Sequence, residues 1–362
     1  MSSAADSLDD APARLDPRWR GLIEFLVTGG ATLALFPVAW LSRWRFGLDE
    51  AEFAFGFLTF HAAFLINDPH FGVTYLLFYR DARRRAFGPV FGGAQRVRYW
   101  VAGLVVPAAL VAWAAVALGR RSAPGIGWMI QLMFGLVGWH YVKQGFGLLA
   151  VLSARRGVQF SPIERRALLA HCLAGWAYAW ASPFEPGRVV EEKGVVYTAL
   201  AHGAGLELVT LVVFLASAVG ALGALAWGAR RRGRLPPLAP LSGFLITVWL
   251  WTVYSSLDPL MIYVIPALHS VQYLYFVWLM RRNQARETER PPHFGRPVGT
   301  QLGLLALSAL AVGWVLFHGA PELLDGLLAP RATRAHPDLG DLGPTPYFAA
   351  VIAVVNIHHY FM

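Results

Sequence analysis

The chain has 362 residues, of which 56% are hydrophobic and only 15% are charged, and its mean hydropathy is +0.47. This composition excludes an ordinary soluble domain and predicts an integral membrane protein. The formal net charge of +9 does not indicate a nucleic-acid partner, because the arginines occur in short runs between apolar segments, as the positive-inside rule requires. The single cysteine, Cys172, excludes an internal disulfide and a multi-cysteine metal site.

The chain begins with small, polar and acidic residues, and we predict a disordered cytosolic tail over residues 1–18. Apolar segments follow throughout residues 19–362, which we predict to form a single transmembrane helical domain. At about 20 residues per span, they predict an all-α fold, a polytopic membrane helix bundle of about ten transmembrane helices, with roughly nine to eleven as the range. In chain order, the candidate spans are Gly21–Leu41, Ala51–Tyr79, Tyr99–Leu118, Ile126–Leu152, Arg166–Ala181, Leu206–Trp227, Leu238–Tyr254, Leu260–Met280, Thr300–Phe317 and Pro346–Met362.

Arginine clusters determine the predicted orientation in the membrane. They lie in the tail and in the loops that follow even-numbered spans, whereas the opposite loops hold few basic residues and are more acidic. The positive-inside rule therefore predicts a multi-pass protein of the cell inner membrane with a cytosolic N-terminus. The last span reaches Met362 without a flanking charge, and we expect the native chain to continue beyond it.

Histidines at membrane depth are the candidate functional residues, because a bilayer does not solvate an imidazole and such residues usually mark a site. Those in even-numbered spans are His70, His140, His269, His358 and His359. His70, His140 and His269 precede the next cytosolic arginine cluster by ten to fifteen residues. They therefore lie at similar depth, about 15 to 22 Å from that boundary. Imidazoles that share a depth match the ligands of iron, copper or zinc; the alternative is that each one hydrogen-bonds a neighbouring helix.

Other polar residues lie near two of these histidines at helical spacing. Lys143 follows His140 at i+3, and Gln272 and Tyr273 follow His269 at i+3 and i+4. Each therefore shares a helix face with its histidine. We predict that these three residues act in catalysis or orient the imidazoles.

Asp68 is a carboxylate deep in the second span, at about the depth of Lys143. We predict a catalytic role in which it pairs with Lys143 or offsets the charge of a metal; the alternative is an ion pair that only fixes helix packing. Pro69 removes a backbone hydrogen bond, so we predict a kink in this span where His70 turns inward, and a cavity at the kink.

The remaining histidines give weaker functional signals. His171 is predicted to be a packing residue, and for His61 packing is favoured over function. The histidines in loops or at span ends, which we predict to be solvated, are His202, His293, His318 and His336. The sequence contains no Walker A motif, no GxSxG and no HExxH.

Four short motifs bear a resemblance to a known family. They are Pro69-His70-Phe71-Gly72, Trp139-His140-Tyr141, His269-Ser270-Val271-Gln272-Tyr273 and a closing motif at Asn356–Tyr360. In their order and composition the chain resembles the Brp/Blh family of bacterial and archaeal multi-span β-carotene 15,15′-dioxygenases. The motifs depart from the family pattern at Phe71, which precedes the glycine, and at Ile357, which stands in place of proline.

The resemblance implies a non-haem iron bound by His70, His140, His269 and either His358 or His359. It also implies an oxygenase that uses dioxygen to act on a lipophilic small molecule, such as a carotenoid or another polyene, reached through membrane lipid. Two other classes stay open on the residues alone. One is a non-enzymatic carrier or proton-coupled transporter with a His/Asp/Lys relay, and the other is a haem protein with two axial histidines.

Overall fold

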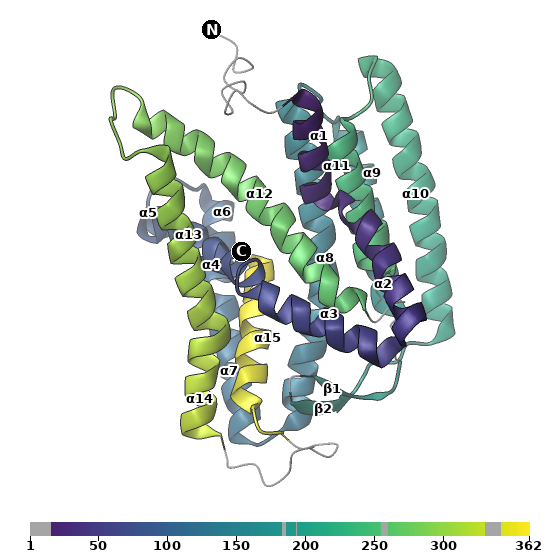
Figure 1. Cartoon of the computed structure of the whole chain (residues 1–362), viewed down its shortest axis with the longest axis vertical. Helices are drawn as coiled ribbons and strands as arrows, with labels where there is room; N and C mark the ends of the chain where they lie inside the picture. Colours follow the sequence, from purple (N-terminus) through teal and green to yellow (C-terminus); the bar gives the residue numbers. More distant parts are fainter. Residues whose placement is uncertain (1–15, 183–185, 193, 255–259, 330–341) are drawn as a thin grey trace. The chain divides into compact units, whose positions relative to one another are not determined.

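The computed structural model describes residues 16–182, 186–192, 194–254, 260–329 and 342–362 (Figure 1). Helices dominate these residues, which confirms the all-α prediction. One antiparallel hairpin, β1 (Val189–Glu192) paired with β2 (Val195–Thr198), lies in a segment predicted to be a loop. Most of the predicted tail lies outside the described residues, but helix α1 already begins at Pro17.

The described chain divides into two compact units. The first comprises Met1–Phe57, Gly138–Phe184 and His202–Phe276, and the second comprises Leu58–Val137, Glu185–Ala201 and Val277–Met362. Three helices contribute residues to both units: α3 (Leu48–Ala63), α8 (Ala123–Arg155) and α12 (Met261–Glu289). The single transmembrane domain stays a prediction, and each unit is described by itself.

The first unit has a helical core built around Phe214. Its own elements are α1 (Pro17–Phe25), a π-helical turn (Leu26–Gly30), α2 (Thr32–Phe46), α9 (Pro162–Ala181), α10 (Ala204–Arg232), α11 (Leu238–Leu245) and a second π-helical segment (Ile246–Val253). Helices α9 and α10 lie side by side (Figure 1). Phe214 of α10 is buried and stacks on the His171 ring of α9, whose Nε2 accepts a hydrogen bond from the Trp249 indole. Ser217 bonds the other ring nitrogen of His171, so this histidine packs the core, as predicted.

An ion pair between buried Glu164 and half-buried Arg232 holds the start of α9 against the end of α10. Ser161 and Glu164 form a capping box that satisfies backbone N–H groups at the start of α9. The Glu164 carboxylate also accepts hydrogen bonds from Arg232 at 2.7 and 2.8 Å. Burial alone would raise the pKa of the Glu164 carboxyl, but the hydrogen bonds from Ser161 and Arg232 outweigh burial and lower this pKa below its ordinary value.

This pair predicts an acid-sensitive contribution to stability. A carboxyl whose pKa is lower in the folded than in the unfolded chain stabilises the fold above its unfolded pKa, and the contribution is lost as the pH falls through the folded pKa. Unfolding of the purified chain in detergent, followed by circular dichroism, is expected to become easier below about pH 4.5. Glu164→Gln should remove part of this dependence, whereas Glu287→Gln, at an exposed carboxylate, should leave it intact. Equal pH profiles for E164Q and the parent protein would contradict the assignment.

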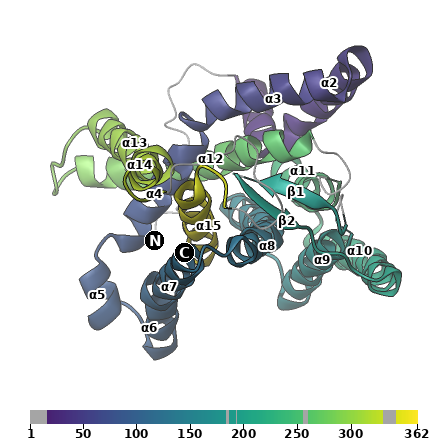
Figure 2. The same ribbon diagram turned by 90° about the horizontal axis from the view of Figure 1, so that it is seen from below.

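The second unit packs two glycine-containing helices together. Its own elements are α4 (Asn67–Tyr79), α5 (Ala82–Phe87), α6 (Gly93–Trp100), a π-helical turn (Val101–Val105), α7 (Val106–Gly119), β1, β2, α13 (Val298–Trp314), a π-helical turn (Val315–Gly319), α14 (Ala320–Leu328) and α15 (Pro346–Phe361). Figure 2 shows α4 beside α13 and α7 beside α15. A Cβ atom at Gly72 would collide with the Ala309 carbonyl, and one at Gly313 with the Asp68 carbonyl, so glycine is what lets α4 and α13 approach closely.

Helix α15 is anchored at its start by a residue of α14. The Asp325 carboxylate accepts hydrogen bonds from the backbone N–H groups of Tyr347 and Phe348, at 2.9 and 2.8 Å. These N–H groups belong to the first turn of α15, which has no intrahelical partner for them. Asp325 therefore acts as an N-terminal cap supplied by another helix.

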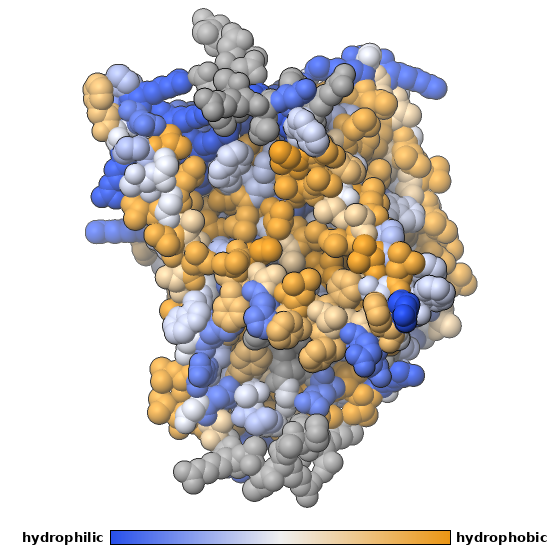
Figure 3. Space-filling model, viewed as in Figure 1, coloured by the Kyte–Doolittle hydropathy of each residue, from blue (hydrophilic) through white to orange (hydrophobic). Residues whose placement is uncertain are grey.

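Three helices of the described chain are long and apolar enough to cross a membrane: Gly93–Gly119, Ala204–Arg232 and Val298–Leu328. A bent pair, Trp19–Gly30 with Thr32–Phe46, would make a fourth if it is one span. Figure 3 shows apolar side chains along α10, with hydrophilic ones at its arginine-rich end. These helices fit a membrane protein, while the predicted number of about ten spans stays a prediction.

The second predicted span, Ala51–Tyr79, is divided into two helices. Helix α3 ends at Ala63 and α4 begins at Asn67, so the chain breaks before Pro69 and not at it. Pro69 occupies the first turn of α4, where its missing N–H costs no intrahelical hydrogen bond. The prediction of a kink at Pro69 was therefore wrong. Pro69 lies in the first turn of a helix and does not bend a continuous one.

Candidate metal centre

His70 and His359 converge in the second unit. His70 lies in the first turn and a half of α4, and His359 lies near the end of α15. Their Nε2 atoms are 2.8 Å apart, and the two side chains are 1% and 2% exposed. The Phe71 ring lies 4.4 Å from the His359 ring and packs edge-on against Phe317. Two imidazole nitrogens thus meet in a buried place walled by aromatic rings.

The contacts of α4 and α15 explain why this pair forms. The cap from Asp325 fixes the start of α15, and the glycines at the crossing of α4 with α13 fix the depth of α4. The Thr74 hydroxyl donates to the His70 carbonyl, which satisfies that oxygen inside a buried helix. Both imidazoles are therefore carried on constrained helices, as a ligand set requires.

His140 and His269 converge in the first unit. Their Nε2 atoms, on α8 and α12, are 3.1 Å apart. The Tyr141 ring lies 4.4 Å from the His269 ring, and His269 is buried. The spatial pairing of these two histidines, 129 positions apart, is a second instance of the same arrangement.

A buried amide network fixes the helix that carries His269. Gln144 donates to the His269 carbonyl at 3.2 Å and to the Gln272 side-chain oxygen at 2.9 Å. Gln272 is fully buried, and its amide donates to the Thr28 carbonyl at 2.6 Å. That carbonyl precedes Gly29, whose φ of 135° breaks the helical hydrogen-bond series. The side chain of Gln272 thus serves to position α12, so the predicted orienting role fits better than the predicted catalytic one.

The spacing within each pair suits two chemistries. A metal bound at about 2.1 Å by two nitrogens at a right angle separates them by about 3.0 Å. A hydrogen bond between two neutral imidazoles gives a similar separation, near 2.9 to 3.0 Å. Axial ligands on opposite sides of a haem iron would be roughly 4 Å apart on the same bond lengths. Neither pair, at 2.8 and 3.1 Å, has the spacing of a haem axial pair.

His358, the other candidate on α15, has a different environment. Its Nε2 lies 3.0 Å from the Ala102 carbonyl, and its Nδ1 lies 2.9 Å from the Tyr75 hydroxyl. A carbonyl only accepts, so Nε2 carries the hydrogen and Nδ1 accepts from Tyr75. Both ring nitrogens are used. Of the two residues that the sequence left open, His359 is therefore the candidate ligand and His358 is a structural residue.

The partner of His358 is a carbonyl that proline leaves unpaired. Val106 donates its N–H to Val101, five residues back, in a π-helical turn. At the same spacing the Ala102 carbonyl faces Pro107, which has no N–H. Within an apolar helix such a carbonyl needs another donor, and the His358 side chain supplies it.

Replacing His358 with alanine is expected to destabilise the chain without removing metal. The change leaves the Ala102 carbonyl and the Tyr75 hydroxyl without this partner, which costs about 1–3 kcal/mol. Thermal unfolding in detergent measures the loss of stability, and metal analysis of the same sample checks that the metal is retained. Metal lost from H358A but kept in His359→Ala would reverse the assignment of the two residues.

Asp68 has a partner that is far from it in the sequence. Its carboxylate lies 2.8 Å from Nε2 of His318, and the His318 ring stacks on Phe64 at 4.2 Å. The prediction that His318 is solvated was wrong. The available signal was that a carboxylate at membrane depth needs a partner, but nothing in the spacing singles out a residue 250 positions away.

The remaining predicted site residues are Lys143 and Tyr273. Lys143 is exposed, and its Nζ lies 6.0 Å from the centroid of the Trp139 ring. Tyr273 is half-buried on α12. Because Asp68 bonds His318, the predicted pairing of Asp68 with Lys143 has a competitor in the structure and stays a prediction.

Comparisons of the chain with protein-family models, with curated proteins and with solved structures find no match. Its own donor atoms are therefore what indicates the chemistry of the candidate centre. Iron, copper and zinc all accept imidazole nitrogens as ligands. The histidines alone therefore do not select one of these metals.

Proposed function

We propose that this chain is a membrane metalloprotein whose histidine pairs, His70 with His359 and His140 with His269, bind a transition metal. The convergence of Nε2 atoms in each pair, at 2.8 and 3.1 Å, is the observation that carries the proposal. That all four histidines serve one ion rests on their predicted common depth in the sequence. Non-haem iron is the metal we propose first, on the resemblance to the Brp/Blh motifs, with copper and zinc as alternatives.

The reaction that we propose is the oxygenation of a lipophilic substrate, with a carotenoid or another polyene as the expected class. Bound iron would supply activation of dioxygen. The residues of the chain would supply the rest: the histidines hold the metal, and the rings of Phe71 and Tyr141 keep water from the imidazoles they contact. Gln272 would keep His269 in place, and Asp68 would add negative charge near His70. Lys143 and Tyr273 are kept as proposed catalytic residues.

The proposed setting is the inner membrane, with about ten spans and a cytosolic N-terminus. The three membrane-capable helices and the arginine distribution support it. A lipid-embedded site suits a substrate that dissolves in the bilayer and reaches the protein laterally. Cysteine-accessibility labelling at single introduced cysteines in the loops would test the orientation, since Cys172 is buried.

Metal analysis and an absorption spectrum of the purified full chain test the function. About one non-haem iron per chain supports the proposal, and a Soret band would replace it with a haem protein. Expression in a carotenoid-producing host, with analysis of cleavage products, then tests the substrate class. Bound iron without any loss of carotenoid would reject the polyene and leave the metal site standing.

A carrier or proton-coupled transporter is the second candidate function. The pair of buried Asp68 and half-buried His318 is the observation that favours it, because carboxylate and imidazole groups at membrane depth form proton relays in transporters. Absence of metal from active, freshly purified protein, together with proton-dependent uptake into vesicles, would favour this function over the oxygenase.

A further inference from the structure

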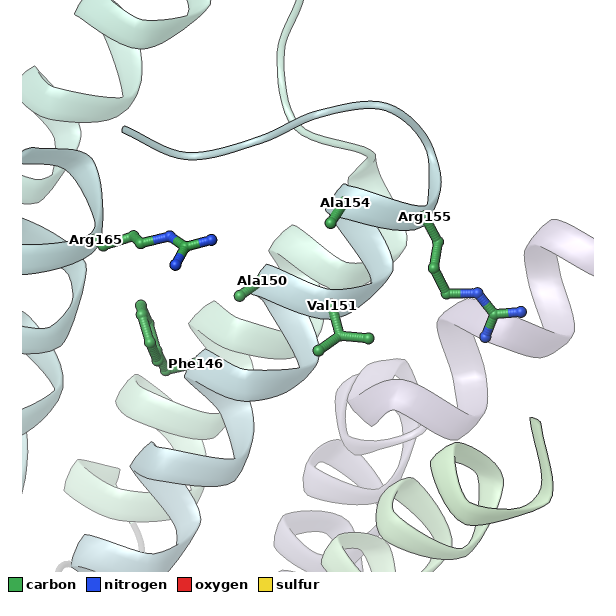
Figure 4. A pocket seen from close by; sticks show the side chains of 6 residues that line it. All are labelled: Phe146, Ala150, Val151, Ala154, Arg155 and Arg165. Atoms are coloured by element: carbon green, nitrogen blue, oxygen red, sulfur yellow. The ribbon is translucent and has the colours of Figure 1, made fainter. Parts of the chain in front are cut away.

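A groove of about 520 Å³ lies on the surface of the first unit, and no histidine is among the residues that line it. Its lining consists of Phe146, Ala150, Val151, Ala154 and Arg155 of α8 and Arg165 of α9. Figure 4 shows Arg165 reaching from α9 toward α8 on one side, above Phe146, and Arg155 extending from α8 on the other side. The floor of the groove is apolar, and the charged residue on each of its two sides is an arginine.

The carboxylates that pair with arginines near the groove bond other arginines than the two that line it. Arg156, next to the groove, bonds Glu24 at 2.6 Å, and Glu164 bonds Arg232 at 2.7 Å. These two carboxylates are thus already engaged. Among the described residues, neither Arg155 nor Arg165 makes an ion pair with a carboxylate. An anion is therefore the ligand that complements these two guanidinium groups.

The depth of the lining residues in the predicted membrane indicates that the ligand also has an apolar part. Phe146 lies nine residues before Arg155 on α8, which is about 13 Å along the helix. Arg155 belongs to an arginine cluster at the predicted cytosolic boundary, so the apolar floor runs from the headgroup region into the hydrocarbon region. A ligand that fills both parts needs an anionic head and an apolar tail.

We propose that this groove binds one anionic phospholipid of the cytoplasmic leaflet. The guanidinium group of Arg165, above Phe146, holds the phosphate, because guanidinium forms paired hydrogen bonds to phosphate oxygens. Arg155, on the other side of α8, adds a second positive charge that attracts the anionic headgroup. An acyl chain lies along Phe146 and Ala150, which are four residues apart on one face of α8. A free phosphate ion would leave the apolar floor unused, and a neutral lipid would leave the two charges unmatched. The proposal rests on the proposed membrane setting but not on the metal.

The test compares lipid binding by the full chain in detergent. Native mass spectrometry would measure retention of phosphatidylglycerol against phosphatidylcholine for the parent protein and three variants. The double variant R155Q/R165Q is expected to bind phosphatidylglycerol roughly 10- to 30-fold more weakly, from about 1 kcal/mol for each basic residue. Ala150→Trp should fill the floor and weaken binding as well. Arg166→Gln, at an exposed arginine outside the lining, is the matched control and should stay within about twofold of the parent.

Three results would overturn the inference. They are equal binding of the two lipids, an equal effect of R166Q and R155Q/R165Q, and displacement of the lipid by millimolar inorganic phosphate or by sn-glycerol 3-phosphate alone. The last would assign the site to a free anion. Metal content is measured on the same samples and is expected to be unchanged. A chain that binds the lipid but no metal would reject the proposed function and leave the lipid site in place.

Discussion

Alanine in place of His70 or His359 is expected to lower bound metal to less than about a tenth of the content of the parent protein. Removing a hydrogen-bond partner of a metal ligand costs about 10- to 100-fold in affinity, and removing the ligand itself should cost at least that. The pair is buried, so no surface residue is available to replace a lost imidazole. Metal analysis after dialysis against a weak chelator measures the loss.

The design includes its own control on the same helix. His358 neighbours His359 in sequence and is equally buried, yet its two ring nitrogens are bound to Ala102 and Tyr75. H358A should therefore keep its metal while losing stability. If H70A and H359A both retain full metal content, the second unit contains a hydrogen-bonded histidine pair and no ligand set.

Alanine at His140 or His269 extends the same experiment to the first unit. Loss of all metal from either variant indicates that these histidines serve the ion that His70 serves. Loss of half of two ions per chain indicates separate sites. Retention of all metal restricts the centre to the second unit. The three outcomes thus assign His140 and His269 to a shared site, to a separate site or to no metal site.

The class of the fold and the identity of the candidate ligands followed from composition and depth. Long apolar segments must satisfy their own backbone hydrogen bonds, so helices were the expected answer. Histidines in such segments are costly unless they have partners, which is why His70, His140 and His269 stood out. The pairing was not predictable, because helix depth fixes one coordinate and leaves rotation about the helix axis free. His358 and His359 show this: neighbours on a helix point about 100° apart, and depth cannot say which one faces His70.

The sequence contains a signal for the break before α4, although the segment was predicted to be one span. Asn67, Asp68 and Pro69 together form a typical helix start, with an acidic residue and a proline in the first turn. Reading the apolar residues on both sides as one span turned this start into an internal kink. The partner of Asp68 could not be predicted for a different reason. His318 is 250 residues away in the sequence, and no local pattern links the two residues.

Gly313→Ala is expected to be among the most damaging single-methyl changes in the second unit. A Cβ at this position would overlap the backbone carbonyl of Asp68 and approach its Cβ atom. Backbone atoms of a packed helix cannot rotate away as a side chain can, so α4 must shift away from α13. Overpacking of this kind costs about 1–3 kcal/mol, and the shift would displace the first turn of α4, two residues from His70.

Gly303 provides a matched control on the same helix. It is exposed on α13, and nothing lies within 4 Å of the Cβ that alanine would add. Gly303→Ala should therefore leave stability unchanged or raise it by up to about 1 kcal/mol, because alanine favours helix. Thermal unfolding of both variants in detergent compares their free energies of unfolding, and metal analysis compares their sites. Because the two changes add the same methyl group to the same helix, a difference between them isolates the crossing of α4 with α13. If G313A and G303A unfold alike, that close crossing is not what holds the helix bearing His70 in place.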